Sequence, residues 1–166
     1  MFAFIPVTRD DDLAGFLAAD DWPFHAGAPS ATVADDAQAF WILADGERAG
    51  LVKLMDLGDD TPMFDLRVRQ AWRGKGAGTA AVAWLTGHLF TSLPGVNRIE
   101  GTTRVDNAAM RAVFRKSGYA KESHYRDAWP GRDGTPYDAV GYAILRRDWE
   151  SGTVTWPDWD DEPSRP

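Results

Sequence analysis

The chain has 166 residues, of which 44% are hydrophobic, and its formal net charge is −7. This length and composition fit one folded domain and exclude a wholly disordered protein, and the acidic balance is opposite to that of a general nucleic-acid binder. Because the chain has no cysteine, it has no disulfide, no thiolate metal ligand and no cysteine nucleophile. The amino terminus lacks the basic start of a signal peptide, and no apolar run approaches the ~20 residues of a membrane span. We therefore expect a cytoplasmic protein that binds neither nucleic acid nor membrane.

The first part of the chain predicts a strand, two short helices and a hairpin. Acidic residues open the first helix, as is common at helix starts. The pair Asp45-Gly46 lies between two apolar runs, which is a strong hairpin signal. The predicted elements are a strand over 1–7, a helix over 9–20, a loop over 21–30, a second helix over 31–40, and strands over 40–46 and 48–57.

The second part predicts two longer helices and four strands. Val82, Leu85 and Leu89 form an apolar stripe at helical spacing, and Gly118 is placed to end the second of these helices. Interleaved strands and helices with two hairpins argue for an α/β (α+β) domain with a mixed sheet. The predicted elements are strands over 62–69, 98–105, 119–129 and 138–149, with helices over 76–92 and 106–119. Residues 1–150 are expected to form this single domain, and 151–166 an acidic tail with Pro and Trp.

The stretch "RGKGAG" combines glycines with basic residues just before a helix. Gly74, Gly76 and Gly78 match neither G-x-G-x-x-G nor G-x-x-x-x-G-K-[ST]. A glycine-rich turn that opens a helix still directs free backbone N–H groups and the positive helix end toward one point. Arg73 and Lys75 add positive charge. The stretch therefore predicts an anion site suited to a pyrophosphate, and the alternative is an ordinary strand-to-helix turn.

Two motifs in order resemble the GNAT superfamily of N-acetyltransferases. "RGKGAG" is similar to the R/Q-x-x-G-x-G/A loop of that family, and the later "DN" followed by "RKSGY" is similar to its strand, Asn, helix and Gly-aromatic pattern. Residues 62–149 resemble the Rim-like, ribosomal-protein-acetylating branch most. The resemblance implies a mostly antiparallel sheet of about seven strands, splayed between strands four and five and flanked by about four helices.

The same resemblance implies acetyl-coenzyme A as acetyl donor. The acceptor would be a primary amine of a small molecule or of a peptide N-terminus, and the sequence does not choose between them. A non-catalytic acyl-coenzyme A sensor with the same fold stays open as the alternative. A homodimer is compatible with the number of Trp residues.

The cofactor residues are implied by position in the motifs. Asn107 would hydrogen-bond the pantetheine arm, unless it is only a helix cap. Arg111 would reach a phosphate, unless it lies on a solvated helix face. The remaining implied residues are Leu66, Arg67 and Val68 for the pantetheine arm, and Arg73, Gly74, Lys75, Gly76, Ala77, Gly78 and Thr79 for the pyrophosphate.

The acid and the base of the reaction are less determined. The tyrosine that many members carry seven residues after the Asn corresponds here to Phe114, which cannot donate a proton. Ser117, Tyr119 and Tyr125 are possible substitutes near that end of the sheet. Glu100, Asp65 and His124 (with Tyr125) are the candidates for the base, because a carboxylate or imidazole on the splayed strands can take a proton from an amine. The alternative for Glu100 is an ion pair with Arg98 or Arg104.

The acceptor pocket is expected near "DDWPFH". Asp21, Trp22, Phe24 and His25 would offer aromatic walls and an acid to an amine, and the alternative is a turn whose aromatic residues fill the core. The loop over 127–138 would cover the acceptor or would merely join two strands. The three histidines are scattered and no H-E-x-x-H occurs, so no metal is expected.

Overall fold

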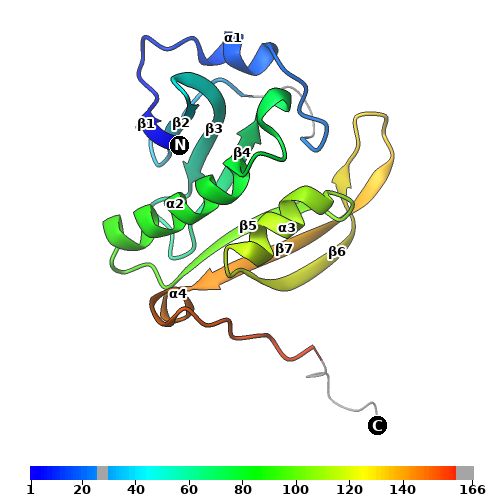
Figure 1. Ribbon diagram of the computed structural model, residues 1–166. Helices are drawn as coiled ribbons and strands as arrows, with labels where there is room; N and C mark the ends of the chain where they lie inside the picture. The colour runs from blue at the N-terminus through cyan, green and yellow to red at the C-terminus, as the bar shows by residue number, and fades with distance from the viewer. Residues whose placement is uncertain (26–29, 160–166) are drawn as a thin grey trace.

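The computed structural model of the chain, which describes residues 1–25 and 30–159, is built on one seven-stranded sheet (Figure 1). The strand order is β1-β2-β3-β4-β5-β7-β6, and every pair is antiparallel except β4 with β5. The strands are β1 (Phe2–Pro6), β2 (Gln38–Ala44), β3 (Glu47–Met55), β4 (Met63–Val68), β5 (Arg98–Arg104), β6 (Ala120–Pro130) and β7 (Pro136–Leu145). The helices are α1 (Leu13–Ala18), α2 (Ala77–Ser92), α3 (Ala108–Lys116) and α4 (Arg146–Ser151), with a 3₁₀ turn η1 (Gln70–Trp72).

The sheet opens between β4 and β5. Their ladder contains one register pair, Met63 with Glu100, and the Glu100 amide donates to the Pro62 carbonyl at 3.2 Å. Beyond this point β4 remains paired with β3 as far as Val68, but its other edge has no strand beside it. The predicted mixed sheet, splayed between its fourth and fifth strands, is confirmed.

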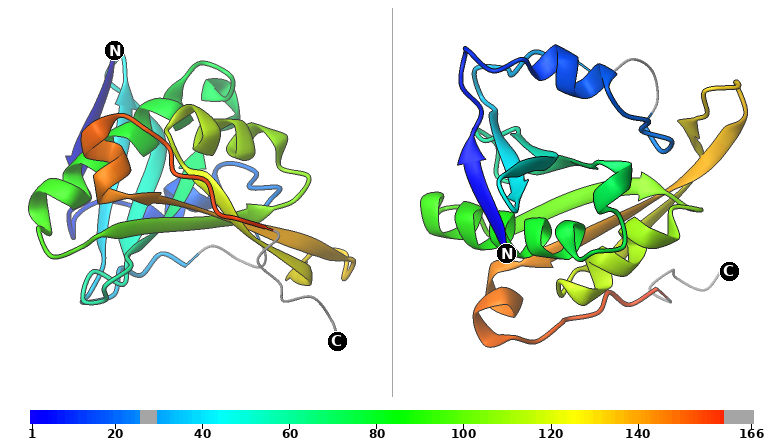
Figure 2. Two further views of the ribbon diagram at one scale, coloured as in Figure 1. Left: turned by 90° about the horizontal axis from the view of Figure 1, so that it is seen from below. Right: turned by 45° about the horizontal axis from the view of Figure 1, so that its top comes forward.

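Two hydrophobic clusters lie on opposite faces of the first half of the sheet. Ile42 belongs to the larger cluster, which α2 and α3 cover, whereas its neighbour Trp41 belongs to the cluster under α1. This alternation follows from the two-residue period of a strand. Figure 2 shows α1 and α2 on opposite sides of β1, β2 and β3. The segment after α1 is thereby held on the face opposite α2.

Two sequence predictions about elements are wrong. Residues 31–37 are not helical, and residues 38–40 of the predicted helix belong to β2, because the antiparallel ladders with β1 and β3 take them into the sheet. The predicted strand over 138–149 ends at Leu145. There the Arg146 guanidinium donates to three carbonyls of the segment that ends α2 and leads into β5, and the chain turns into α4.

The segment after α4 contacts the domain through Thr155 and Trp159. The buried Asp148 carboxylate accepts hydrogen bonds from the Thr155 amide and hydroxyl at 2.9 and 2.7 Å. The Lys121 ammonium on β6 lies 5.3 Å from the ring centre of Trp159. The rest of the predicted tail, 160–166, lies outside the described residues.

Candidate functional site

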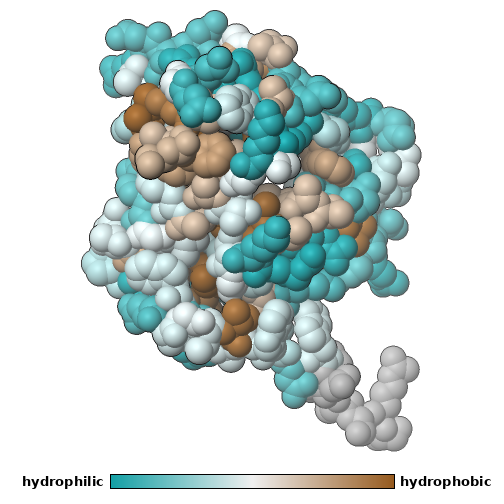
Figure 3. All heavy atoms as spheres, in the orientation of Figure 1, coloured by the Kyte–Doolittle hydropathy of each residue, from teal (hydrophilic) through white to brown (hydrophobic). Residues whose placement is uncertain are grey.

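A cavity of about 390 Å³ lies where β4 and β5 separate. It is bounded by residues 22–25 before the sheet, 66–68 of β4, the start of α2 and the inner side of α3. Arg67, Arg73 and Lys116 line it, and among the described residues no Asp or Glu does. In a chain of net charge −7 this lining is locally cationic. Figure 3 shows the face that carries α2 and α3, on which hydrophobic groups lie among a mostly hydrophilic surface.

The glycines of the loop meet two structural requirements, a positive φ and a close helix contact. Gly74 and Gly76 have φ of +73° and +88°, which favours glycine because it has no Cβ. A Cβ on Gly78 would lie 3.2 Å from Cγ2 of Val113, so glycine there lets α2 approach α3 closely. Gly76 is the N-cap of α2 without any side-chain cap, so the first-turn N–H groups have no partner from a cap side chain. The loop thus directs an uncapped helix start into the cavity.

Arg73 is held by the protein itself. Its Nε donates to the Val68 carbonyl at 2.9 Å, and its Nη2 donates to the carbonyl of Asp21. These bonds tie the loop to the end of β4 and to the segment after α1. Lys75 lies over the ring of Trp72, with its Nζ 5.2 Å from the ring centre.

The two polar residues expected on α3 are engaged in local bonds. Asn107 caps α3, because its Oδ1 accepts from the Met110 amide at 3.1 Å while it lines the cavity. The Arg111 guanidinium donates to the Val105 carbonyl at 2.8 Å and is not among the lining residues. Lys116 lines the cavity instead and was missed by the sequence analysis. In the sequence, Lys116 was visible only as a basic residue in the last turn of a predicted helix. The structure adds that this helix, α3, packs beside the glycine loop.

His25, Asp65 and Arg67 form a connected charged group at the cavity wall. The His25 Nε2 lies 2.7 Å from Oδ1 of Asp65, and Arg67 Nε donates to Oδ2 of Asp65 at 2.9 Å. Burial alone would raise the pKa of Asp65, but the hydrogen bonds and charges of His25 and Arg67 outweigh it and hold the pKa below its ordinary value. The sequence analysis assigned Asp65 to proton transfer and His25 to the acceptor pocket, and the structure brings them together.

Arg67 is a buried cation with an incomplete set of partners. Its side chain is 10% exposed, and its Nη1 has no hydrogen-bond partner within the described part of the chain. The Trp22 ring lies 5.7 Å from its Cζ. A buried N–H without a partner costs free energy and calls for an explanation.

The other candidates for the base lie outside the cavity lining. Glu100 is paired with Arg98 at 2.7 Å, which is the alternative interpretation of this residue, and its side chain is 35% exposed. His124 is paired with Asp138 at 2.7 Å on the β6–β7 hairpin, and Tyr125 is 55% exposed. Arg98 on the same strand thus reaches Glu100, as the ion-pair interpretation expected, and the role of Glu100 as a base stays a prediction.

Phe114, at the position of the family tyrosine, and two of its possible substitutes, Tyr119 and Ser117, place their rings or hydroxyl in the interior. Phe114 is 1% exposed and stacks on Tyr142 with ring centres 4.6 Å apart. The buried Tyr119 hydroxyl bonds the Thr86 hydroxyl at 2.8 Å, and burial raises the pKa of Tyr119 far above its usual value. The Ser117 hydroxyl is buried without a hydrogen-bond partner among the described residues. None of the three lines the cavity.

The β6–β7 hairpin contacts the segment after α1 (Figure 1). Arg132 donates to the Asp21 carboxylate at 2.7 Å and to the Trp22 carbonyl at 2.8 Å. Trp22 is 3% exposed and packs in the cluster under α1, so the core-filling interpretation holds for its ring. Trp22, Phe24 and His25 also line the cavity, whereas Asp21 does not.

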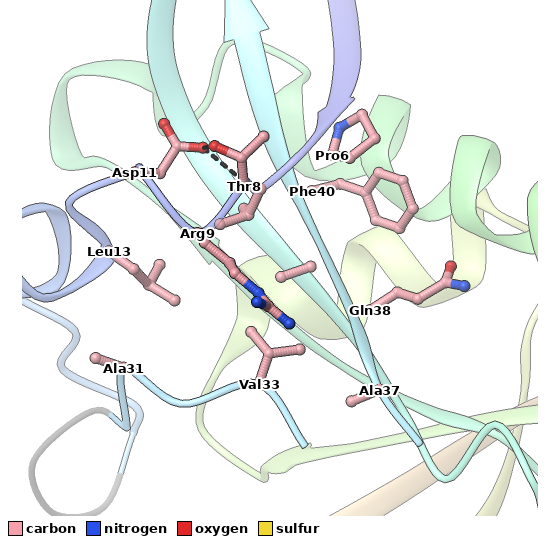
Figure 4. A pocket seen from close by; sticks show the side chains of 12 residues that line it. Pro6, Thr8, Arg9, Asp11, Leu13, Ala31, Val33, Ala37, Gln38 and Phe40 are labelled. Atoms are coloured by element: carbon pink, nitrogen blue, oxygen red, sulfur yellow. Dashed lines mark hydrogen bonds between the residues drawn. The ribbon is translucent and has the colours of Figure 1, made fainter. Parts of the chain in front are cut away.

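A second cavity, of about 660 Å³, lies on the α1 side of β1 and β2 (Figure 4). Arg9 and Val33 line it, and Asp11 at its rim accepts a hydrogen bond from the Thr8 amide at 2.8 Å. It shares no lining residue with the cavity at the splayed strands. Within residues 1–25 and 30–159, no cluster of three or more His, Asp or Glu could hold a metal ion. No helix in this part of the chain is long and apolar enough to cross a membrane.

The splayed strands and the glycine-rich start of α2 define the fold of an N-acetyltransferase. The family described as "Acetyltransferase (GNAT) domain" matches residues 4–120, and the chain belongs to this family. The Rim-like resemblance agrees with the relative YdaF of Bacillus subtilis (strain 168), whose name describes it as a ribosomal N-acetyltransferase. It is 31% identical over 111 residues, which are 66% of this chain and 60% of the relative.

Two solved structures are also similar to this chain. RimJ of Mycobacterium smegmatis, determined in complex with CoA-disulfide, is 26% identical with a TM-score of 0.61, covering 73% of this chain and 63% of that one. The ribosomal-protein-S18-alanine N-acetyltransferase of Escherichia coli is 21% identical with a TM-score of 0.71, covering 87% and 94%, and shows the fold alone. The chain thus spans about 60% of the length of its curated relative.

Proposed function

We propose that this protein is an acetyl-coenzyme A-dependent N-acetyltransferase whose donor binds in the cavity between β4 and β5. The observation that carries the proposal is the uncapped, glycine-rich start of α2 in a cavity with cationic but no acidic lining among the described residues. Such a helix start is suited to a pyrophosphate. A relative that is solved with a coenzyme A derivative supports the same donor class.

The residues of the cavity fit the donor part by part. The backbone of residues 73–79 would hold the pyrophosphate, and Lys116 replaces Arg111 as the nearby cation on α3. The open edge of β4 at Leu66, Arg67 and Val68 would pair with the pantetheine arm as an added strand would. Asn107, already occupied as a cap, would offer its amide group to the same arm.

The proposed chemistry is direct transfer. Bound acetyl-coenzyme A supplies a thioester whose leaving thiolate has a pKa of ~8.5, so it departs without a strong acid. Phe114 in the position of the family tyrosine is compatible with this. The backbone N–H groups of β4 near Val68 would stabilise negative charge on the carbonyl oxygen. With no cysteine in the chain, no acetyl-cysteine step is available.

The acceptor would be a primary amine of a small molecule or of a peptide N-terminus, bound on the side of Trp22, Phe24 and His25. The Rim-like relatives favour the peptide. In this proposal residues 1–150 form the catalytic domain and 151–166 an accessory tail. A cytoplasmic location and a homodimer stay predictions.

The experiment is a coenzyme A release assay with acetyl-coenzyme A and a panel of amines and N-terminal peptides, with calorimetry of coenzyme A binding in parallel. Amine-dependent release would establish the activity and the acceptor class together. Binding without release on any acceptor would favour the sensor with the same fold. Absence of binding would refute the donor assignment.

A further inference from the structure

His25 and Asp65 come from separate parts of the chain and meet at the cavity wall. They are forty residues apart, and their side chains are 25% and 24% exposed. The two carboxylate oxygens of Asp65 have different partners. Oδ1 lies 2.7 Å from His25 Nε2, and Oδ2 accepts a hydrogen bond from Arg67 Nε at 2.9 Å. Both bonds leave the carboxylate little freedom to rotate. Asp65 therefore fixes the orientation of the His25 ring, and Arg67 fixes the orientation of Asp65.

The hydrogen bonds determine the tautomer of His25. The pKa of Asp65 is raised by burial but lowered more strongly by His25 and Arg67, so the group stays a carboxylate and can only accept. His25 Nε2 must then carry the hydrogen in this bond. In the neutral ring the lone pair lies on Nδ1, which has no hydrogen-bond partner among the described residues. A basic nitrogen is thus left free on a residue that lines the cavity.

The cavity lining places His25 beside the proposed reacting region. His25 lines the same cavity as Leu66 and Val68, where the thioester end of the donor would pair with β4. The charged groups near the pair are Lys53, opposite Asp65 on β3, Arg67 on β4, and Arg104 on β5, which lies over the ring of Phe24. Arg104 is paired with Asp106 at 2.6 Å, so Asp65 is the anion that balances Lys53 and Arg67.

We propose that His25 accepts the proton of the attacking amine through Nδ1 and that Asp65 is the positioning residue that sets its tautomer. The inference rests on the proposed function. As the amine nitrogen bonds to the acetyl carbonyl carbon and the carbon–sulfur bond breaks, the electron pair of that bond leaves with the thiolate. One N–H proton of the amine passes to Nδ1 of His25, which returns it to solvent or to the thiolate.

The test compares His25→Gln and Asp65→Asn with wild type, using acetyl-coenzyme A and the amine of the panel with the highest turnover. A positioned base contributes ~10²–10⁴-fold, so kcat should fall at least ~100-fold in His25→Gln and by less in Asp65→Asn. Coenzyme A affinity by calorimetry should stay within about twofold of wild type. The acidic limb of the kcat/KM profile should disappear in His25→Gln.

His124→Gln is the matched control, because it breaks the other His–Asp pair of the same 2.7 Å length, on the exposed hairpin outside the cavity lining. It should leave kcat and its pH profile unchanged. A second readout needs no donor: ring ¹⁵N NMR of the three histidines should show His25 as the Nε2–H tautomer, with loss of that preference in Asp65→Asn.

The outcomes separate the two proposals. Wild type that binds no coenzyme A, or releases none with any amine, overturns the proposed function and this inference together. Wild type that turns over while His25→Gln keeps its kcat and pH profile overturns the inference alone. The inference alone is also overturned if His25 is the Nδ1–H tautomer in the free protein. Equal losses of kcat in His25→Gln and His124→Gln would overturn it as well.

Discussion

Gly76 offers a test of the anion site with a calculable effect. Replacing it with Asp puts an L residue at φ +88°, which costs about 1–2 kcal/mol. No atom lies within 4 Å of the added Cβ, so no steric cost is added. For a chain of this size the loss lowers Tm by roughly 2–8 °C. In the proposed complex the new carboxylate would face a phosphate, and two like unit charges ~5 Å apart repel by about 3 kcal/mol at an effective dielectric of ~20. Coenzyme A affinity should then fall at least ~100-fold.

Gly46→Asp is the matched control for this experiment. Gly46 has φ +84° in the β2–β3 turn and also has open space around its Cβ, so the backbone cost is the same without a phosphate nearby. Thermal unfolding measures the shared strain, and calorimetry with coenzyme A at fixed salt measures the difference. Equal affinities of the two variants would refute the assignment of the α2 start as the phosphate site.

Three further predictions concern the hairpin, the core and acid stability. Arg132→Ala removes the hydrogen bond to Asp21 and should raise the KM for the acceptor severalfold, while the Kd for coenzyme A stays constant. A change in the Kd for coenzyme A alone would contradict a role of Arg132 on the acceptor side. Gly101→Ala places a Cβ 2.8 Å from Cζ of Phe114 and should cost about 1–3 kcal/mol in urea unfolding, whereas an unchanged midpoint would mean that the ring moves freely. The pKa of Asp11 is lowered from 3.8 to about 2, chiefly by the hydrogen bond from a backbone amide, so its ionised form stabilises the fold above about pH 4 and this contribution is lost as the pH falls toward 2. The Tm difference between wild type and Asp11→Asn should therefore shrink over that range, and a constant difference would count against it.

Local patterns identified most of the elements because their signals are short-range. The hairpin at Asp45-Gly46, the helix over 76–92 and the stop at Gly118 each depend on a few adjacent residues. The helix predicted over 31–40 was wrong because β1 and β3 supply hydrogen bonds to Gln38 and the residues after it, and this pairing outweighs local preference. The strand predicted to Trp149 ended early because the partners of Arg146 lie about fifty residues away.

The sequence by itself determined the family and predicted the anion site at the glycine loop, because both rest on short motifs of adjacent residues. Only the tertiary structure decided which polar residues meet. Arg98 neutralises Glu100, Arg111 turns inward, and His25 reaches Asp65 from the segment after α1. These pairings depend on strand register and on the face to which each side chain points, and a one-residue change in either reverses them.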